Sequence, residues 1–173
     1  MNTLPPAPDL TRRQVLLLHR VANGESHAVI AADPALHLRP DEIGAAIDEL
    51  LAVTGTRTVP HLAAWAAARR FVTDTAEPCA ALAVNLRLVP RLHQLLRGWT
   101  GGQSSSEITA EFGVSYGTMH GYSSRLLGEL GVRSQVQASV AGVLAGLTLL
   151  SDIDPTWPAE PLNRTTGPIR WAA

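Results

Sequence analysis

The sequence contains an internal repeat, and this limits the folds open to the chain more than any other feature. The two copies align at an offset of 78 residues, which becomes 76 beyond a two-residue insertion near position 35 of the first copy. A repeat of this length indicates two copies of one small unit, each of which must bury its own core. The matching positions are residues 10–13 with 88–91, Gly24 with Gly102, Ser26 with Ser104, Ile30 with Ile108, Ile43 with Met119, Leu50 with Leu126, and Gly55 with Gly131.

Each copy predicts four short helices and no strand, so the expected fold class is all-α. In the second copy, Ser104 and Glu107 form a capping box that opens a helix. Thr11 and Gln14 form the matching box in the first copy, and Pro40-Asp41-Glu42 is expected to open its third helix. The helices expected in the second copy span about 90–99, 105–112, 116–130 and 135–150.

The second copy resembles the DNA-binding domain of the LuxR/NarL family of bacterial regulators over residues 88–150. The motifs that carry the resemblance are Leu88-x-Pro-Arg91, Gly102-x-Ser-x-x-Glu-Ile108, Ser115-x-x-Thr118-Met119 and Leu126-x-x-x-Leu-Gly-Val132. The first copy is similar but more degenerate. The resemblance implies a helix-turn-helix module whose third helix enters the DNA major groove and whose fourth helix pairs modules as dimers.

The expected organisation is therefore two tandem four-helix modules of the LuxR type with flanking segments. Trp157 and Trp171 indicate that part of the C-terminal segment packs back onto the modules. The expected divisions are a disordered arm over 1–9, a degenerate module over 10–72, a linker or helix extension over 73–87, the second module over 88–150 and a Pro-rich tail over 151–173.

The third helix of the second copy predicts one buried and one exposed face. Met119, Tyr122 and Leu126 recur at helical spacing, which is typical of a face turned to the core. Contacts with DNA bases would come from the opposite face. The residues predicted to contact DNA are Ser105, Ser106, Thr118, His120, Gly121, Ser124, Arg125 and Arg133.

Several residues depart from the family pattern. The resemblance implies cations where this chain has His120, Glu129 and Gln135, and a histidine where it has Tyr122. The chain has 14 Arg and Lys residues, all of them Arg, against 15 acidic residues, giving a net charge of -1. Since affinity for DNA rises with the number of phosphates neutralised, we expect weak binding. The same side chains are also compatible with a solvated helix face that has no function.

Glycine is frequent on the expected DNA-binding helix. Gly117, Gly121 and Gly128 each cost on the order of 0.8–1 kcal/mol relative to alanine inside a helix. Two explanations remain open: close approach of another backbone, or drift in a module that no longer reads bases.

The fourth helix of the second copy has small residues at helical spacing. They are compatible with pairing between modules and with packing inside one module. Pairing would produce either an internal pseudo-dimer or a homodimer. The residues predicted for dimerisation are Ala138, Ala141, Gly142, Ala145 and Gly146.

The third helix of the first copy is acidic. It carries Asp41, Glu42, Asp48 and Glu49, with no arginine between residues 40 and 55. Carboxylates repel phosphates, so we expect the first copy to contact protein rather than DNA. The predicted function is a bacterial transcriptional regulator that binds double-stranded DNA through the second copy. The alternative is an interaction module that has lost DNA binding and modulates another regulator or the transcription machinery.

Other classes of function have little support in the sequence. The single cysteine, Cys79, excludes an intramolecular disulfide. No signal peptide or apolar run near 20 residues is found, so the expectation is a cytoplasmic protein without membrane contact. The 6 histidines show no metal-ligand spacing. We therefore expect no metal, no cofactor and no enzymatic activity.

Overall fold

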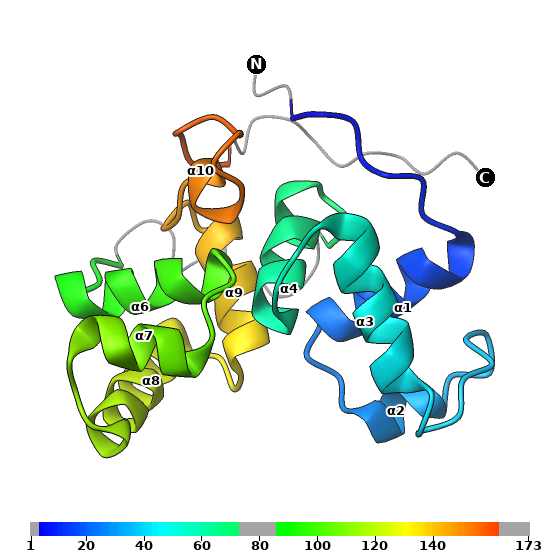
Figure 1. The fold of residues 1–173 in the computed structure, drawn as a ribbon, viewed down its shortest axis with the longest axis horizontal. Helices are drawn as coiled ribbons and strands as arrows, with labels where there is room; N and C mark the ends of the chain where they lie inside the picture. The colour runs from blue at the N-terminus through cyan, green and yellow to red at the C-terminus, as the bar shows by residue number, and fades with distance from the viewer. Residues whose placement is uncertain (1–3, 73–85, 163–173) are drawn as a thin grey trace.

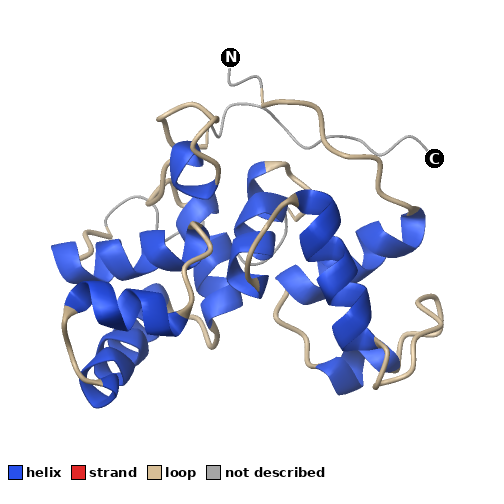
Figure 2. Ribbon diagram, in the orientation of Figure 1, coloured by secondary structure: helices blue, strands red, loops and turns tan. Residues whose placement is uncertain are grey.

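The computed structural model describes residues 4–72 and 86–162, and this part of the chain is helical (Figures 1 and 2). Its extended pairing is limited to an isolated bridge between Leu149 and Pro161. The all-α prediction is confirmed for these residues. Most of the expected linker, Cys79 and Trp171 lie outside the described ranges.

The helices fall into two groups that follow the two copies of the repeat. The first copy contains α1 (Arg12–Ala22), α2 (His27–Ala31), α3 (Ile43–Thr54) and α4 (Val59–Ala68). The second copy contains α6 (Pro90–Thr100), α7 (Ser105–Phe112), α8 (Tyr116–Leu130) and α9 (Gln135–Leu144), followed by the short α10 (Leu150–Ile153). The first group lies on the right of Figure 1 and the second on the left, with α4 and α9 between them.

The capping boxes predicted at Thr11 and at Ser104 form. The Thr11 hydroxyl accepts from the backbone amide of Gln14, and the Gln14 side chain accepts from the backbone amide of Thr11. Ser104 and Glu107 make the same pair of bonds at the start of α7. These contacts satisfy amides that the first turn of a helix leaves unpaired, and they explain why the sequence located these helix starts.

Two helix boundaries differ from the expected ones. The third helix of the first copy begins only at Ile43, because the Glu42 carboxylate accepts from the Arg39 amide and closes a turn before the helix. The fourth helix of the second copy ends at Leu144 rather than near 150. Gly146 has a φ of 69°, a left-handed conformation that favours glycine, and the chain turns there before α10.

Two hydrophobic cores form, one for each copy. The second core lies among α6, α7 and α8 and contains Trp99 and Leu126. The first core is built from α1, α3 and α4, but also receives Val140 and Val143 from α9 and Trp157 from the C-terminal segment. The second copy and the segment after it therefore complete the core of the first.

Two residues of the N-terminal arm, Leu4 and Pro5, contact the first copy. Leu4 packs on the first core, and the Pro5 carbonyl accepts a 2.6 Å hydrogen bond from Arg69. The Arg69 guanidinium also stacks on two indoles, 4.9 Å from the ring centres of Trp65 and Trp157. Arg69 thus ties both terminal segments to α4, at the edge of the first core.

The two copies are joined mainly through α4 and α9, which share the most extensive contact of any pair of described helices. Every residue of α4 from His61 to Ala68 is buried, as is the stretch of α9 from Ala138 to Val143. Alanine predominates in the α4 stretch, and Ala, Ser and Gly make up most of the α9 stretch. Such small side chains allow two helix backbones to approach closely. The first core and the α4–α9 contact are therefore continuous.

Equivalent positions of the two copies make equivalent contacts across this interface. Gly102, in the turn after α6, lies against the His61 ring of α4. Gly24, at the corresponding turn of the first copy, lies against Gln137 of α9, where an added Cβ would come within 3.1 Å of the Gln137 Cγ. Such reciprocal pairing defines an approximate two-fold relation between the copies.

His61 and Gln137 also make equivalent hydrogen bonds. The Arg57 amide donates to His61 Nδ1, so Nε2 carries the proton and donates to the Ile153 carbonyl at 2.9 Å. At the other side of the interface, the Arg133 backbone amide donates to Gln137 Oε1, and the side-chain Nε2 of Gln137 donates to the Asn23 carbonyl. Burial lowers the pKa of the His61 imidazole below its ordinary value.

This arrangement predicts a contribution of His61 to the pH dependence of stability. The unfolded chain takes up the proton near the ordinary pKa of 6.5 while the folded chain resists it, so the contribution is complete above that pH and is lost as the pH falls below it. His61→Gln places at this position the amide used at Gln137 and should remove the contribution. The measurement is urea unfolding of both proteins at about pH 5.5 and about pH 7.5.

The exposed His27, at the start of α2, provides the control. His27→Gln should keep the wild-type loss of stability at the lower pH. An identical pH dependence in His61→Gln and the wild type would contradict the assignment of a neutral, buried His61.

Candidate nucleic-acid interface

The α8 helix is fixed to the second core by one face. Met119, Leu126 and Leu130 are buried there, and Tyr122 packs edge-to-face on Phe112 with ring centres 6.2 Å apart. Ser115 caps the helix by accepting from the Thr118 amide, and Gly131 ends it with a φ of 67°. The predicted buried face is confirmed, so the rotation of α8 about its axis is fixed by packing.

The opposite face of α8 is exposed along its length. No part of the described chain covers it, and a Cβ added at Gly121 or Gly128 would find no atom within 4 Å. All eight residues predicted to contact DNA are exposed: Ser105, Ser106, Thr118, His120, Gly121, Ser124, Arg125 and Arg133. They lie on α7, on α8 and in the loop after α8.

Tyr116 is an exposed member of this surface that the sequence did not single out. It is the first residue of α8 and is 70% exposed, the most exposed large hydrophobic side chain of the described chain. Tyr116 precedes Met119 by three residues, so periodicity alone would place it in the core. It is exposed because the first turn of α8 extends past the end of the second core.

Some polar groups of this surface have partners nearby in the chain. The Thr118 hydroxyl bonds with Ser115 at 3.0 Å, and the Arg125 guanidinium pairs with Glu129 at 2.8 Å. The Arg125–Glu129 pair is exposed and one helical turn apart, so it is worth only about 0.3–0.5 kcal/mol. Arg125 can therefore leave Glu129 for another anion at small cost.

Arg133, in the loop after α8, differs from its counterpart in the first copy. That counterpart, Arg57, reaches across the interface and pairs with Glu107 at 2.9 Å. Hydrogen bonds from the Ser104 amide and from Arg57 hold the pKa of Glu107 at about 2. The residue equivalent to Glu107 is Val29, and within the described ranges Arg133 makes no ion pair. Of these two equivalent arginines, Arg133, beside α8, is thus the one that remains available to bind another anion.

The α3 helix, the counterpart of α8, has the opposite electrostatic character. With the offset of 76, Asp48 and Glu49 occupy the positions of Ser124 and Arg125. Both carboxylates are exposed, and Glu49 accepts a 3.0 Å hydrogen bond from Gln14. The third helices of the two copies therefore present different chemistry on equivalent surfaces.

Only some of the residues predicted for dimerisation lie where α9 packs on α4. Ala138 and Ala141 are buried on α9, but Gly142 packs inside its own copy, where an added Cβ would lie 2.9 Å from the Leu96 Cδ2 atom. Ala145 and Gly146 lie beyond the last turn of α9. The expected seam of five small residues on one helix is therefore corrected, because the turn at Gly146 ends the helix early.

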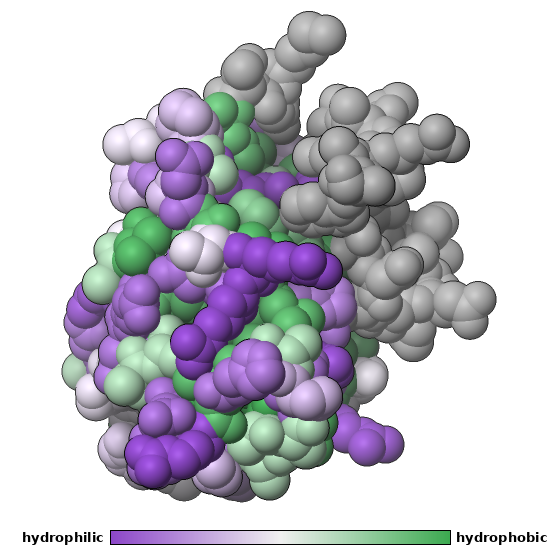
Figure 3. Space-filling view, turned by 90° about the vertical axis from the view of Figure 1, so that its right-hand side faces the viewer, coloured by the Kyte–Doolittle hydropathy of each residue, from purple (hydrophilic) through white to green (hydrophobic). Residues whose placement is uncertain are grey.

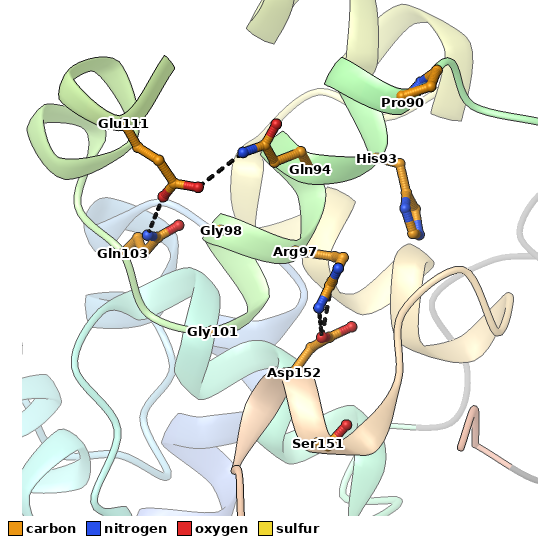
Figure 4. A pocket seen from close by; sticks show the side chains of 10 residues that line it. All are labelled: Pro90, His93, Gln94, Arg97, Gly98, Gly101, Gln103, Glu111, Ser151 and Asp152. Atoms are coloured by element: carbon orange, nitrogen blue, oxygen red, sulfur yellow. Dashed lines mark hydrogen bonds and ion pairs between the residues drawn. The ribbon is translucent and has the colours of Figure 1, made fainter. Parts of the chain in front are cut away.

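Two pockets lie away from α8. One, of about 620 Å³, opens between α6, α7 and α10 (Figure 4). Its carboxylates are engaged: Glu111 accepts from Gln94 at 2.8 Å and Gln103 at 2.7 Å, and Asp152 pairs with Arg97 at 2.7 Å. These bonds tie the helices around the pocket together, which gives its polar groups a structural role.

The other pocket, of about 780 Å³, lies beside α1 and is lined by Arg12, Arg13, Leu16 and His37 among others. Figure 3 views the molecule from the side of the first copy, where hydrophobic and hydrophilic side chains are intermixed.

Across residues 4–72 and 86–162, no three His, Cys, Asp or Glu side chains are grouped as metal ligands. No helix in those ranges is long and apolar enough to cross a bilayer.

Comparisons with known proteins give no assignment: no protein-family model matches the sequence, and no curated protein or solved structure is significantly similar to the chain. Function is therefore inferred from the residues of α8 and their surroundings.

Gly121 and Gly142 lie in different environments, so replacing each with alanine should have opposite effects on the free energy of unfolding. Gly121→Ala should raise the free energy of unfolding by about 0.8–1 kcal/mol, because alanine favours the helix and its methyl group enters open space. Gly142→Ala should lower it by about 1–3 kcal/mol, because the fully buried Leu96 has no room to yield. Urea unfolding of both variants measures the difference. Destabilisation by Gly121→Ala would mean that α8 is covered.

Proposed function

We propose that the chain is a DNA-binding transcriptional regulator of bacterial type, built from two tandem modules of the LuxR type. In this proposal the second copy binds double-stranded DNA by inserting α8 into the major groove, and the first copy supports it through α4. The repeat, the four-helix order of each copy and the motifs of residues 88–150 favour this assignment.

The observation that carries the proposal is the outward face of α8. A helix fixed by Met119 and Leu126 presents exposed small and polar groups, chiefly Thr118, His120 and Ser124. Hydroxyl and imidazole groups hydrogen-bond with base edges, and each good bidentate contact to a base is worth about 1–3 kcal/mol of discrimination. The lack of side chains at Gly117 and Gly121 favours close approach of the helix to bases.

The charges of this surface predict weak binding with a shallow dependence on salt. Arg133 is a free cation and Arg125 can be released from Glu129, while neither Ser105 nor Ser106 carries charge. Each phosphate neutralised contributes about -0.9 to the slope of log affinity against log salt concentration. We expect about two such contacts, fewer than in a strongly basic DNA-binding protein.

The alternative function, an interaction module without DNA binding, is favoured by one observation: the exposed Asp48 and Glu49 on α3. Acidic side chains suit contact with a basic protein surface. This alternative leaves the free Arg133 and the exposed polar groups of α8 without a role, so DNA binding is the better-supported proposal.

Titration of the full chain with a pool of random-sequence duplexes, at about 50 mM and about 200 mM salt, tests the proposal. The His120→Ala variant should bind the duplexes enriched by the wild type at least about tenfold more weakly, because a base contact is lost. Arg133→Ala should weaken binding to all duplexes similarly and reduce the salt slope by about 1.

His27→Ala and Arg12→Ala are matched controls, since both side chains are exposed on the first copy, away from α8. They should bind like the wild type. Absence of binding at the lower salt concentration, or equal losses in the α8 variants and the controls, would overturn the proposal.

A further inference from the structure

We infer that this chain recognises a single, non-palindromic segment of duplex DNA, with one chain bound at each site. The inference rests on the proposed function and specifies the kind of DNA that α8 reads. It follows from how the two copies pair and from the charge of α3.

The first step is that the pairing of the copies is closed within the chain. The buried stretches of α4 and α9 face each other, and the contacts of Gly102 with His61 and of Gly24 with Gln137 complete the pairing on both sides. An approximately two-fold contact uses the same surface of both partners. The pairing surface of each copy is therefore occupied by the other copy.

The second step is that the two-fold relation makes α3 the counterpart of α8. A symmetric pair of DNA-binding modules reads two half-sites, whose centres lie roughly one helical turn, or about 10 bp, apart. In this chain the second half-site would have to be read by α3. The sequence at that position therefore decides whether the chain reads one segment of DNA or two.

The third step is that α3 is built against contact with DNA. Where α8 has Ser124 and Arg125, α3 has the exposed carboxylates of Asp48 and Glu49. Like charges repel, and burial of a carboxylate against phosphates leaves it without a partner. The first copy thus completes the core and the interface but contributes no second reading helix. The DNA contact is that of one module, on the order of 600–1,000 Å² of protein surface.

Selection of random-sequence duplexes by the full wild-type chain tests this inference. The expected result is one asymmetric motif without an inverted copy, and one chain per duplex by native mass spectrometry. Enrichment of an inverted repeat with two chains per duplex would overturn the inference while leaving the proposed function in place. Failure to enrich any duplex would overturn both.

A gain-of-function variant tests the role assigned to α3. Asp48→Ser/Glu49→Arg gives α3 the residues that α8 has at these positions. We expect this variant to prefer duplexes with two inverted copies of the selected motif, spaced by roughly 10 bp, at least fivefold over duplexes with one copy. The wild type should show no preference beyond the statistical factor of about two for two copies.

The control variant Asp9→Ser/Glu160→Arg changes the net charge by the same amount at exposed positions outside α3. Its affinity for both duplexes should rise together, because added positive charge acts on all DNA alike. If the α3 variant showed no more preference for two copies than this control, the placement of α3 as the counterpart of α8 would be overturned. Thermal unfolding of each variant establishes that it is folded before binding is compared.

Discussion

The packing of α4 on α9 is the interaction on which the rest of the structure depends. The stretches His61–Ala68 of α4 and Ala138–Val143 of α9 are buried and consist largely of small residues. Units of about 60 residues have small cores and are marginally stable alone. Here Val140 and Val143 of α9 enter the core of the first copy, so the second copy stabilises the first. The same contact fixes which surfaces remain exposed.

Within this frame the two copies have diverged on their surfaces rather than in their folds. Arg57 pairs with Glu107 across one side of the interface, whereas the residue equivalent to Glu107 in the first copy is Val29, which has no carboxylate to pair with Arg133. On the third helices, an arginine of α8 corresponds to Glu49 of α3. A shared fold does not imply a shared function. The distribution of charge favours DNA contact for the second copy and a supporting role for the first.

The sequence predicted the parts of this fold that depend on local signals. The capping boxes at Thr11 and Ser104 and the periodic apolar residues of α8 have local causes, and each was located correctly. The end of α9 was missed, since the stretch from Ala138 to Leu150 is mostly apolar and carries no charged residue that would mark where the helix stops. A glycine such as Gly146 is compatible with a helix or with a left-handed turn, and only packing decides between them.

The periodicity of the apolar residues of α8 also predicted that the candidate site is exposed. It did not predict which residues of the chain lie near the site. The exposure of Tyr116 depends on where the second core ends in space, and the availability of Arg133 depends on whether the first copy supplies a carboxylate to pair with it. The closed pairing of α4 with α9 is likewise a long-range property. The sequence left open whether the copies pair within one chain or between two, because small residues at helical spacing are compatible with both.

Backbone amide chemical shifts of the ¹⁵N-labelled full chain, followed during titration with the most enriched duplex, test the central claim most directly. The claim is that the closed α4–α9 pairing leaves α8 as the surface that reads DNA. It predicts large shift changes confined to the start of α7, to α8 and to the loop at Arg133, with α3 and the α4–α9 contact unchanged. Changes of equal size on α3, or none on α8, would contradict it.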